Sequence, residues 1–114
     1  MKDNLIFVKH MVESLTNIEK FSKNLTKEKF CRSRLRQSAI IREFEIVGEA
    51  AKNLSNSFRT KYPMINWAPI IGFRDKLIHH YFGLNLERIW SVIVYDLPSL
   101  KQKLREIVNQ EDIK

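Results

Sequence analysis

Four candidate functional side chains lie within one short stretch, residues 67–82 (WAPIIGFRDKLIHHYF): Arg74, Asp75, His79 and Tyr81. Imidazole titrates near neutral pH and can take up or release a proton. Guanidinium can bind two phosphate oxygens and stabilise negative charge as it develops. Metal-free cleavage of RNA needs these groups: a base for the 2′-hydroxyl, an acid for the leaving oxygen and positive charge at the phosphorus. Arg74 and His79 are therefore the candidate catalytic residues, and no cofactor is expected.

Helical geometry separates the two candidate catalytic residues. Apolar residues recur at helical spacing through residues 67–82, which predicts a helix that Gly83 ends. Five residues place Arg74 and His79 about 140° apart around such a helix, so one copy of the chain makes a poor active site. Two copies that meet across a two-fold axis could bring both pairs to one phosphate. Asp75 precedes His79 by four residues, a spacing at which it could hold the imidazole in one tautomer.

The same residues have a purely structural interpretation. Arg74 shares the apolar stripe of the predicted helix with Trp67, Ile78 and Tyr81. A buried, unpaired guanidinium costs several kcal/mol, so it needs a partner or a function. A network of arginine, aspartate and histidine on a packed helix would satisfy it, and Tyr81 would then be an ordinary core aromatic.

The rest of the chain predicts an all-α bundle of four or five helices in a single domain, residues 1–114. The expected elements are a helix at 4–22, a long helix at about 27–55, a short helix or loop at 55–63, the central helix and a last helix that starts after Asn85. Thr26 and Asn85 are expected N-caps, and Pro98 is expected to kink the last helix. Residues from about 110 to 114 are expected to be a frayed tail.

The predicted helix at 27–55 combines two apolar faces with a basic first half. The faces contain Ile40, Phe44, Val47, Ala51 and Leu54 on one side and Leu35, Ala39, Ile46 and Ala50 on the other, which indicates packing against two neighbours. The basic residues are Lys27, Lys29, Arg32, Arg34 and Arg36; they form either a solvated face or a patch that follows RNA phosphates. Glu45 and Glu49 are like charges four residues apart, so a basic partner from another helix is expected.

Composition restricts the class of protein. The 114 residues carry a formal charge of +7 with a pI near 9.7, which favours anionic partners such as RNA or an acidic protein. Cys31 is the only cysteine, so no internal disulfide can form and a reducing cytoplasm is expected. No run approaches the ~18 apolar residues of a membrane span, and the first residues lack the apolar core of a signal peptide.

Together with three flanking segments, the R-x-x-x-x-H-x-Y pattern resembles the HEPN superfamily, small helical domains that include toxin ribonucleases. Residues 46–51 (IVGEAA), 63–67 (PMINW) and 90–98 (WSVIVYDLP) follow the order found in the HepT-like branch, the toxins of HepT/MntA toxin–antitoxin pairs. The resemblance extends through most of the chain. Asp75 departs from the branch, which often has asparagine after the arginine.

This resemblance implies a dimeric, metal-independent endoribonuclease that serves as the toxin of a type VII-like toxin–antitoxin pair. In this interpretation, His79 is the acid/base, Arg74 binds the phosphate, and Asp75 orients His79. Tyr81 would accept AMP from a nucleotidyltransferase antitoxin, which would silence the enzyme. Two alternatives remain: a catalytically inactive HEPN module that docks a nucleotidyltransferase and binds nucleotide, and a purely structural helical adaptor.

Overall fold

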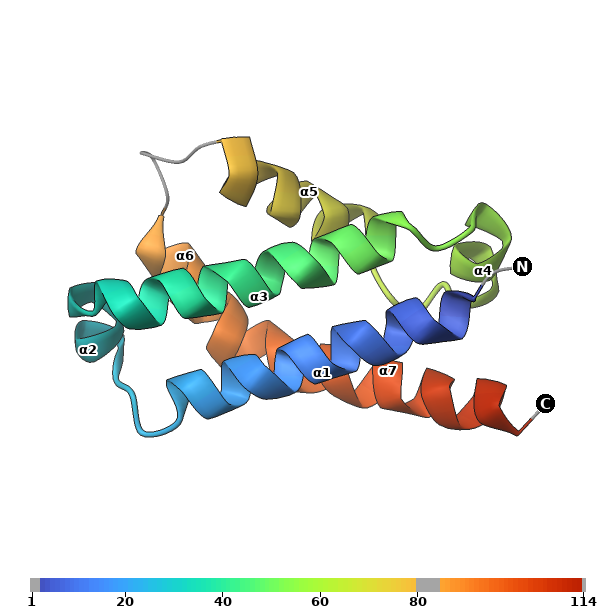
Figure 1. Cartoon of the computed structure of the whole chain (residues 1–114), viewed down its shortest axis with the longest axis horizontal. Coiled ribbons are helices and arrows are strands. Elements are labelled where there is room, and N and C mark those ends of the chain that lie inside the picture. Colours follow the sequence, from blue (N-terminus) through green and yellow to red (C-terminus); the bar gives the residue numbers. More distant parts are fainter. Residues whose placement is uncertain (1–2, 80–84, 114) are drawn as a thin grey trace.

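The computed structural model describes residues 3–79 and 85–113, and every regular element in these ranges is a helix. The elements are α1 (Asn4–Ser22), α2 (Lys27–Arg32), α3 (Arg34–Lys52), α4 (Asn56–Lys61), α5 (Trp67–His79), α6 (Leu86–Ser91), the π-helical segment η1 (Val92–Asp96) and α7 (Leu97–Asp112). Figure 1 shows α3 between α1 and α5, while α7 runs along the other side of α1. The predicted all-α bundle is confirmed for the described residues.

The core is built from the apolar stripes of α1, α3 and the last helices. Val8, Met11, Leu15 and Ile18 of α1 are fully buried, as the predicted helix at 4–22 requires. The turn after α1 contains Asn24, which adopts a positive φ of 64°, a conformation that asparagine tolerates better than most residues. These buried side chains hold α1 against α3 and α7, so α1 fixes the position of α3.

The helix predicted at 27–55 is interrupted at Ser33, and this break was not predicted. Ser33 leaves the helical conformation (φ −108°, ψ 98°), ends α2 and becomes the N-cap of α3, where its side chain accepts a hydrogen bond from Arg36 N at 3.1 Å. Thr26 caps α2 as expected, by accepting from Lys29 N at 3.1 Å. Serine competes with the backbone for its hydrogen bonds, and this is the physical reason for a break that periodicity did not reveal.

The two apolar faces of α3 are explained within a single chain. The first face is buried, with Ile40 fully inaccessible and Phe44 only 5% exposed. On the second face Ala50 is buried but Leu35 is 79% exposed. Because α1 packs on one side of α3 and α5 on the other, the two stripes do not by themselves require a second copy of the chain.

The last helix bends at a π-helical segment. Asn85 caps α6 as predicted, by accepting from Arg88 N at 3.1 Å. The expected kink near Pro98 is realised as η1 directly before α7, with Pro98 in the first turn of α7, where its missing N–H is tolerated. The helix continues to Asp112, so the fraying expected from residue 110 is not observed up to that residue.

Trp67 anchors the start of α5, the helix that carries the candidate catalytic residues. The indole Nε1 donates to the carbonyl oxygens of Arg59 and Tyr62 at 3.1 and 3.0 Å, and the side chain is 8% exposed. The helix begins at Trp67 as predicted, and its expected end at Gly83 lies outside the described residues. Within the described ranges, no helix is long and apolar enough to cross a membrane.

Candidate active site

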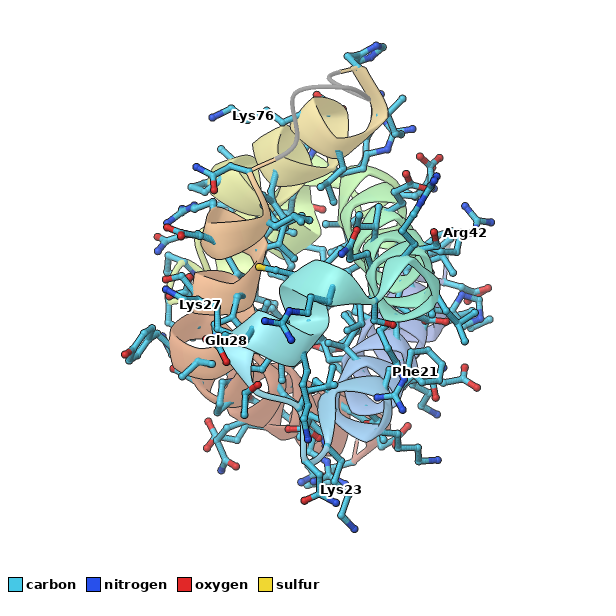
Figure 2. All side chains as sticks on the ribbon, turned by 90° about the vertical axis from the view of Figure 1, so that its left-hand side faces the viewer. Phe21, Lys23, Lys27, Glu28, Arg42 and Lys76 are labelled. Atoms are coloured by element: carbon cyan, nitrogen blue, oxygen red, sulfur yellow. The ribbon has the colours of Figure 1, made fainter. Side chains whose placement is uncertain are left out.

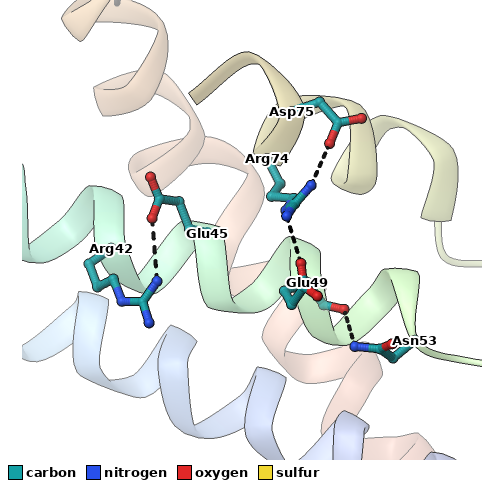
Figure 3. Close-up of polar contacts among 6 residues, drawn as sticks. All are labelled: Arg42, Glu45, Glu49, Asn53, Arg74 and Asp75. Atoms are coloured by element: carbon teal, nitrogen blue, oxygen red, sulfur yellow. Dashed lines mark hydrogen bonds and ion pairs between the residues drawn. The ribbon is translucent and has the colours of Figure 1, made fainter. Parts of the chain in front are cut away.

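Arg74 lies between α5 and α3 and is held there by two carboxylates (Figure 3). Its Nη2 lies 2.7 Å from Glu49 Oε1 on α3, and its Nη1 lies 2.8 Å from Asp75 Oδ1 on α5. The Arg74 side chain is 19% exposed, whereas the two carboxylates are about half exposed. Arg74 Nε is buried and has no hydrogen-bond partner among the described residues. The guanidinium is therefore fixed in direction, with both of its ends neutralised.

Gly48 is what allows Arg74 to come so close to α3. A Cβ atom built on Gly48 would lie 2.1 Å from Arg74 Cβ and 2.7 Å from Arg74 Cγ. Carbon atoms in contact are normally 3.5–4.0 Å apart, so no other residue fits here unless the two helices separate. Gly48 thus positions the backbone of α5 at the residue that carries the guanidinium.

The structure pairs Asp75 with Arg74 rather than with His79. No hydrogen bond or ion pair joins Asp75 to His79 in the part of the chain that the structure describes, although the two are four residues apart. His79 is exposed at the end of the described part of α5. The proposed modification site, Tyr81, lies outside the described residues, as does His80.

A hollow of about 260 Å³ opens beside Arg74, and three helices line it. We call this hollow the Arg74 hollow. It is lined by Phe7 and His10 of α1; Arg42, Glu45, Ile46, Glu49, Ala50 and Asn53 of α3; and Arg74 and Ile78 of α5. His79 is not among them. The structure therefore confirms that Arg74 and His79 occupy different faces of α5, as the five-residue spacing predicts.

Polar residues of α3 form a row along the floor of the Arg74 hollow (Figure 3). Arg42 Nη1 lies 3.5 Å from Glu45 Oε1, and the Asn53 side chain donates to the Glu49 carbonyl oxygen at 3.0 Å. Glu49 has the expected basic partner from another helix, but the prediction was wrong for Glu45, whose partner belongs to its own helix. Arg42 and Asn53 were not predicted as site residues, although their spacing from the two glutamates, three and four residues, places all four on one helical face.

The basic residues of the predicted RNA-binding patch do not line the Arg74 hollow. Lys27, Lys29, Arg32, Arg34 and Arg36 are exposed on α2 and at the start of α3. Two of them have local partners: Lys27 Nζ lies 4.0 Å from Glu87, and Arg36 Nη1 donates to the Phe21 carbonyl oxygen at 2.9 Å. In the end-on view of Figure 2, Lys27 and Arg42 lie on opposite sides of α2. None of these five basic residues therefore shares the Arg74 hollow with Arg74.

A larger cavity, about 480 Å³, lies on another part of the molecule, between α5 and the helices from α6 to α7. Its walls are mostly apolar, with Phe44 and Phe73 in edge-to-face contact. It contains none of the candidate catalytic residues. Within residues 3–79 and 85–113, no group of three or more His, Cys, Asp or Glu side chains is arranged to hold a metal ion.

Comparison with known proteins adds to this geometry. The model of the family "Ribonuclease HepT-like" matches residues 11–107, a range that contains the whole R-x-x-x-x-H-x-Y pattern. The chain belongs to the HepT-like ribonuclease family. The resemblance drawn from residues 46–51, 63–67 and 90–98 is therefore confirmed, and so is the expectation of a ribonuclease.

Relatives of this HepT-like protein come from archaea and bacteria. A probable ribonuclease HepT of Thermococcus cleftensis is 38% identical over 101 residues, which cover 89% of this chain and 92% of the relative. Proteins with RNase in their names are 38% identical over 107 residues in Methanocaldococcus jannaschii and 36% over 111 residues in Caldanaerobacter subterraneus. These alignments cover 94% and 97% of this chain and 88% and 99% of the relatives. No solved structure matches the chain significantly.

Proposed function

We propose that this HepT-like ribonuclease is the toxin of a type VII-like toxin–antitoxin pair and cleaves RNA internally without a metal ion. What supports the proposal most is Arg74, a guanidinium fixed at the edge of an open hollow by Glu49, Asp75 and the close approach at Gly48. Such a pre-oriented cation is suited to a phosphate group whose negative charge grows during the reaction.

The chemistry requires one arginine and at least one imidazole. The RNA 2′-hydroxyl attacks the adjacent phosphorus and gives up its proton to a base. The bond from phosphorus to the 5′-oxygen breaks, and that oxygen leaves with a proton from an acid. His79 serves as the acid/base and Arg74 binds the phosphate. The products are a 2′,3′-cyclic phosphate and a 5′-hydroxyl.

The arrangement of these residues favours a site shared between two copies of the chain. Arg74 faces the hollow, while His79 is exposed on another face of α5 and does not line the hollow. Ile78, which follows Arg74 by one turn and lines the same hollow, is 39% exposed although it is apolar. A homodimer with a two-fold axis near α5 would cover Ile78 and place His79 of one copy near Arg74 of the other.

The acidic neighbours of Arg74 set a condition on RNA binding. Glu49 and Asp75 each contact one Nη atom of the guanidinium, so an RNA phosphate competes with both carboxylates for Arg74. Both carboxylates are about half exposed, and ion pairs with that much solvent contact are weak enough to exchange. The two carboxylates also lower the positive charge available to a growing phosphate charge, and this favours the second candidate function, a catalytically inactive module that docks a nucleotidyltransferase and binds nucleotide.

Regulation in this proposal acts on Tyr81. A nucleotidyltransferase antitoxin would transfer AMP from ATP: the tyrosine hydroxyl attacks the α-phosphorus, pyrophosphate leaves, and the phenolic proton passes to a base. The added phosphate would compete with RNA for Arg74 through its negative charge. The toxin, its antitoxin and the RNA substrate would meet in the cytoplasm.

Purified protein and a labelled RNA test the catalytic part of the proposal. Wild type should cleave the RNA in the presence of EDTA and leave a 2′,3′-cyclic phosphate, and Arg74→Ala and His79→Ala should each abolish cleavage while they keep the helical circular dichroism spectrum. Wild-type activity in His79→Ala would refute the mechanism. Absence of cleavage by folded, unmodified wild type would favour the binding module.

Tyr81→Phe tests the regulatory part separately. This variant should still cleave RNA and should escape inhibition by the antitoxin and ATP, because the attacking hydroxyl is absent. Intact-mass spectrometry should show added AMP on wild type and none on the variant. AMP on Tyr62 or Tyr95 with Tyr81 unmodified would contradict the assignment.

A further inference from the structure

His10 of α1 lines the Arg74 hollow, to which the R-x-x-x-x-H-x-Y motif contributes Arg74 of α5. The hollow is lined by His10 and Phe7 from α1, by Arg74 from α5 and by the polar row of α3 between them. The histidine of the motif, His79, does not line it. Among the described imidazoles of one chain, that of His10 therefore shares a hollow with the phosphate-binding arginine, and His10 was not predicted as a site residue.

The imidazole of His10 is not engaged elsewhere. It makes no hydrogen bond or ion pair with any other residue in the ranges 3–79 and 85–113, and its side chain is exposed. Its ring packs edge-on against Phe7, with ring centroids 6.5 Å apart and planes 83° apart. This contact limits the orientations of the imidazole and leaves its nitrogens free to bind a group from outside the chain.

The other polar groups of the Arg74 hollow already have partners. Arg74 is paired with Glu49, Arg42 is paired with Glu45, and Asn53 donates to the backbone of α3. A phosphate that binds the Arg74 guanidinium competes there with Glu49 and Asp75. The imidazole of His10, in contrast, can hydrogen-bond to a ribose hydroxyl or a phosphate oxygen without breaking a contact of the folded chain.

The size of the Arg74 hollow matches part of a nucleotide. Its volume of about 260 Å³ corresponds to roughly nine water molecules at about 30 Å³ each, which is room for a phosphate and an adjoining ribose. We propose that His10 is a substrate-binding residue, which contacts the sugar–phosphate backbone of the RNA strand whose phosphate is held at Arg74. This inference rests on the proposed ribonuclease function and assigns to α1 a part of the RNA site.

Binding of RNA to a cleavage-deficient protein measures the contribution of His10 directly. In the His79→Ala background, the dissociation constant of a fluorescein-labelled decaribonucleotide is measured by anisotropy, with and without His10→Ala. Loss of one hydrogen bond of this kind should weaken binding about five- to tenfold. Asn17→Ala is the matched control: Asn17 lies two turns farther along the same side of α1, is absent from the lining of the hollow and should change binding less than twofold.

A spectroscopic measurement separates contact from an indirect structural effect. With histidine labelled with ¹³C in the ring, His79→Ala protein retains the signals of His10 and His80, and the signal missing from the double variant identifies His10. Titration with the decaribonucleotide should shift the His10 ring signal with the same midpoint as the anisotropy curve. Thermal unfolding should be unchanged by His10→Ala, because the side chain is exposed.

The possible failures can be told apart. If His79→Ala protein binds the RNA but His10→Ala does not alter the dissociation constant and the His10 signal does not move, the assignment of His10 is wrong and the proposed function stands. If wild-type protein neither binds nor cleaves the RNA, the proposed function itself fails.

Discussion

Replacement of Gly48 by alanine tests the packing that positions Arg74. The new Cβ would lie 2.1 Å from Arg74 Cβ, about 1.4 Å closer than a normal carbon–carbon contact. Both atoms are fixed to their backbones, so a change of rotamer cannot relieve the overlap and α5 must move away from α3. Overpacking of this kind costs about 1–3 kcal/mol, while alanine in place of glycine in a helix returns about 1 kcal/mol. The difference is a net loss of about 0–2 kcal/mol, so we expect Gly48→Ala to lower the free energy of unfolding by up to about 2 kcal/mol.

Gly72 provides the matched control, because it lies in α5 two residues before Arg74 and a Cβ there would meet nothing within 4 Å. Gly72→Ala should raise the free energy of unfolding by about 0.4–1 kcal/mol. Urea unfolding followed by the fluorescence of Trp67 and Trp90, at one fixed protein concentration, measures both variants.

RNA cleavage by the two glycine variants provides the functional readout. A displacement of Arg74 by about 1 Å should reduce cleavage by Gly48→Ala on the order of a hundredfold, since catalytic geometry tolerates little movement. If Gly48→Ala is as stable as Gly72→Ala and cleaves RNA at the wild-type rate, the close approach of α3 and α5 does not position the arginine.

Three further variants test the electrostatics, the helix break and the alkaline stability. Glu49→Gln removes one carboxylate that competes with phosphate at Arg74, so RNA should bind about two- to fivefold more tightly in anisotropy measurements. Ser33→Ala removes the cap at the start of α3 and should lower the free energy of unfolding by about 1 kcal/mol in urea. Burial and its hydrogen bond to Glu111 raise the pKa of Tyr62 above its usual value. The unfolded chain therefore loses this proton at lower pH than the folded one, so stability should fall above about pH 10, and Tyr62→Phe should reduce that fall.

Each of these variants has a control of the same chemical type. Glu13→Gln removes an exposed carboxylate of α1 that does not line the hollow, and Ser38→Ala removes an exposed serine inside α3. Tyr95→Phe removes a hydroxyl from a side chain that is 77% exposed. Equal effects of Glu49→Gln and Glu13→Gln on RNA binding, of Ser33→Ala and Ser38→Ala on stability, or of the two tyrosine variants on the alkaline transition would contradict the respective argument.

Periodicity and caps were enough to predict most of the fold. The apolar stripe of α1 and the caps at Thr26 and Asn85 depend only on residues close together in the sequence, so they can be recognised from the sequence. The break at Ser33 was missed because an apolar stripe can continue in phase across a single non-helical residue. The π-helical segment depends on how the last helix packs against the bundle, and a stripe of apolar residues does not encode that.

The candidate site could be predicted only in part, because it combines three helices. The five-residue spacing placed Arg74 and His79 on different faces of α5, and the structure agrees. A basic partner from another helix was predicted for Glu49, and Arg74 of α5 is that partner. The positions of His10 and Arg42 depend on the rotations of α1 and α3 about their axes, so the hollow that they share with Arg74 is visible only in the folded chain.

The central claim, that Arg74 and His79 act from different copies of the chain, is tested most directly by mixing two inactive variants. Arg74→Ala and His79→Ala are denatured together, refolded as a mixture and assayed for RNA cleavage beside each variant alone. In a two-fold dimer with two shared sites, half of the molecules are mixed and each has one complete site, so about a quarter of wild-type activity should return. Activity in the mixture no higher than that of the separate variants would contradict the shared site.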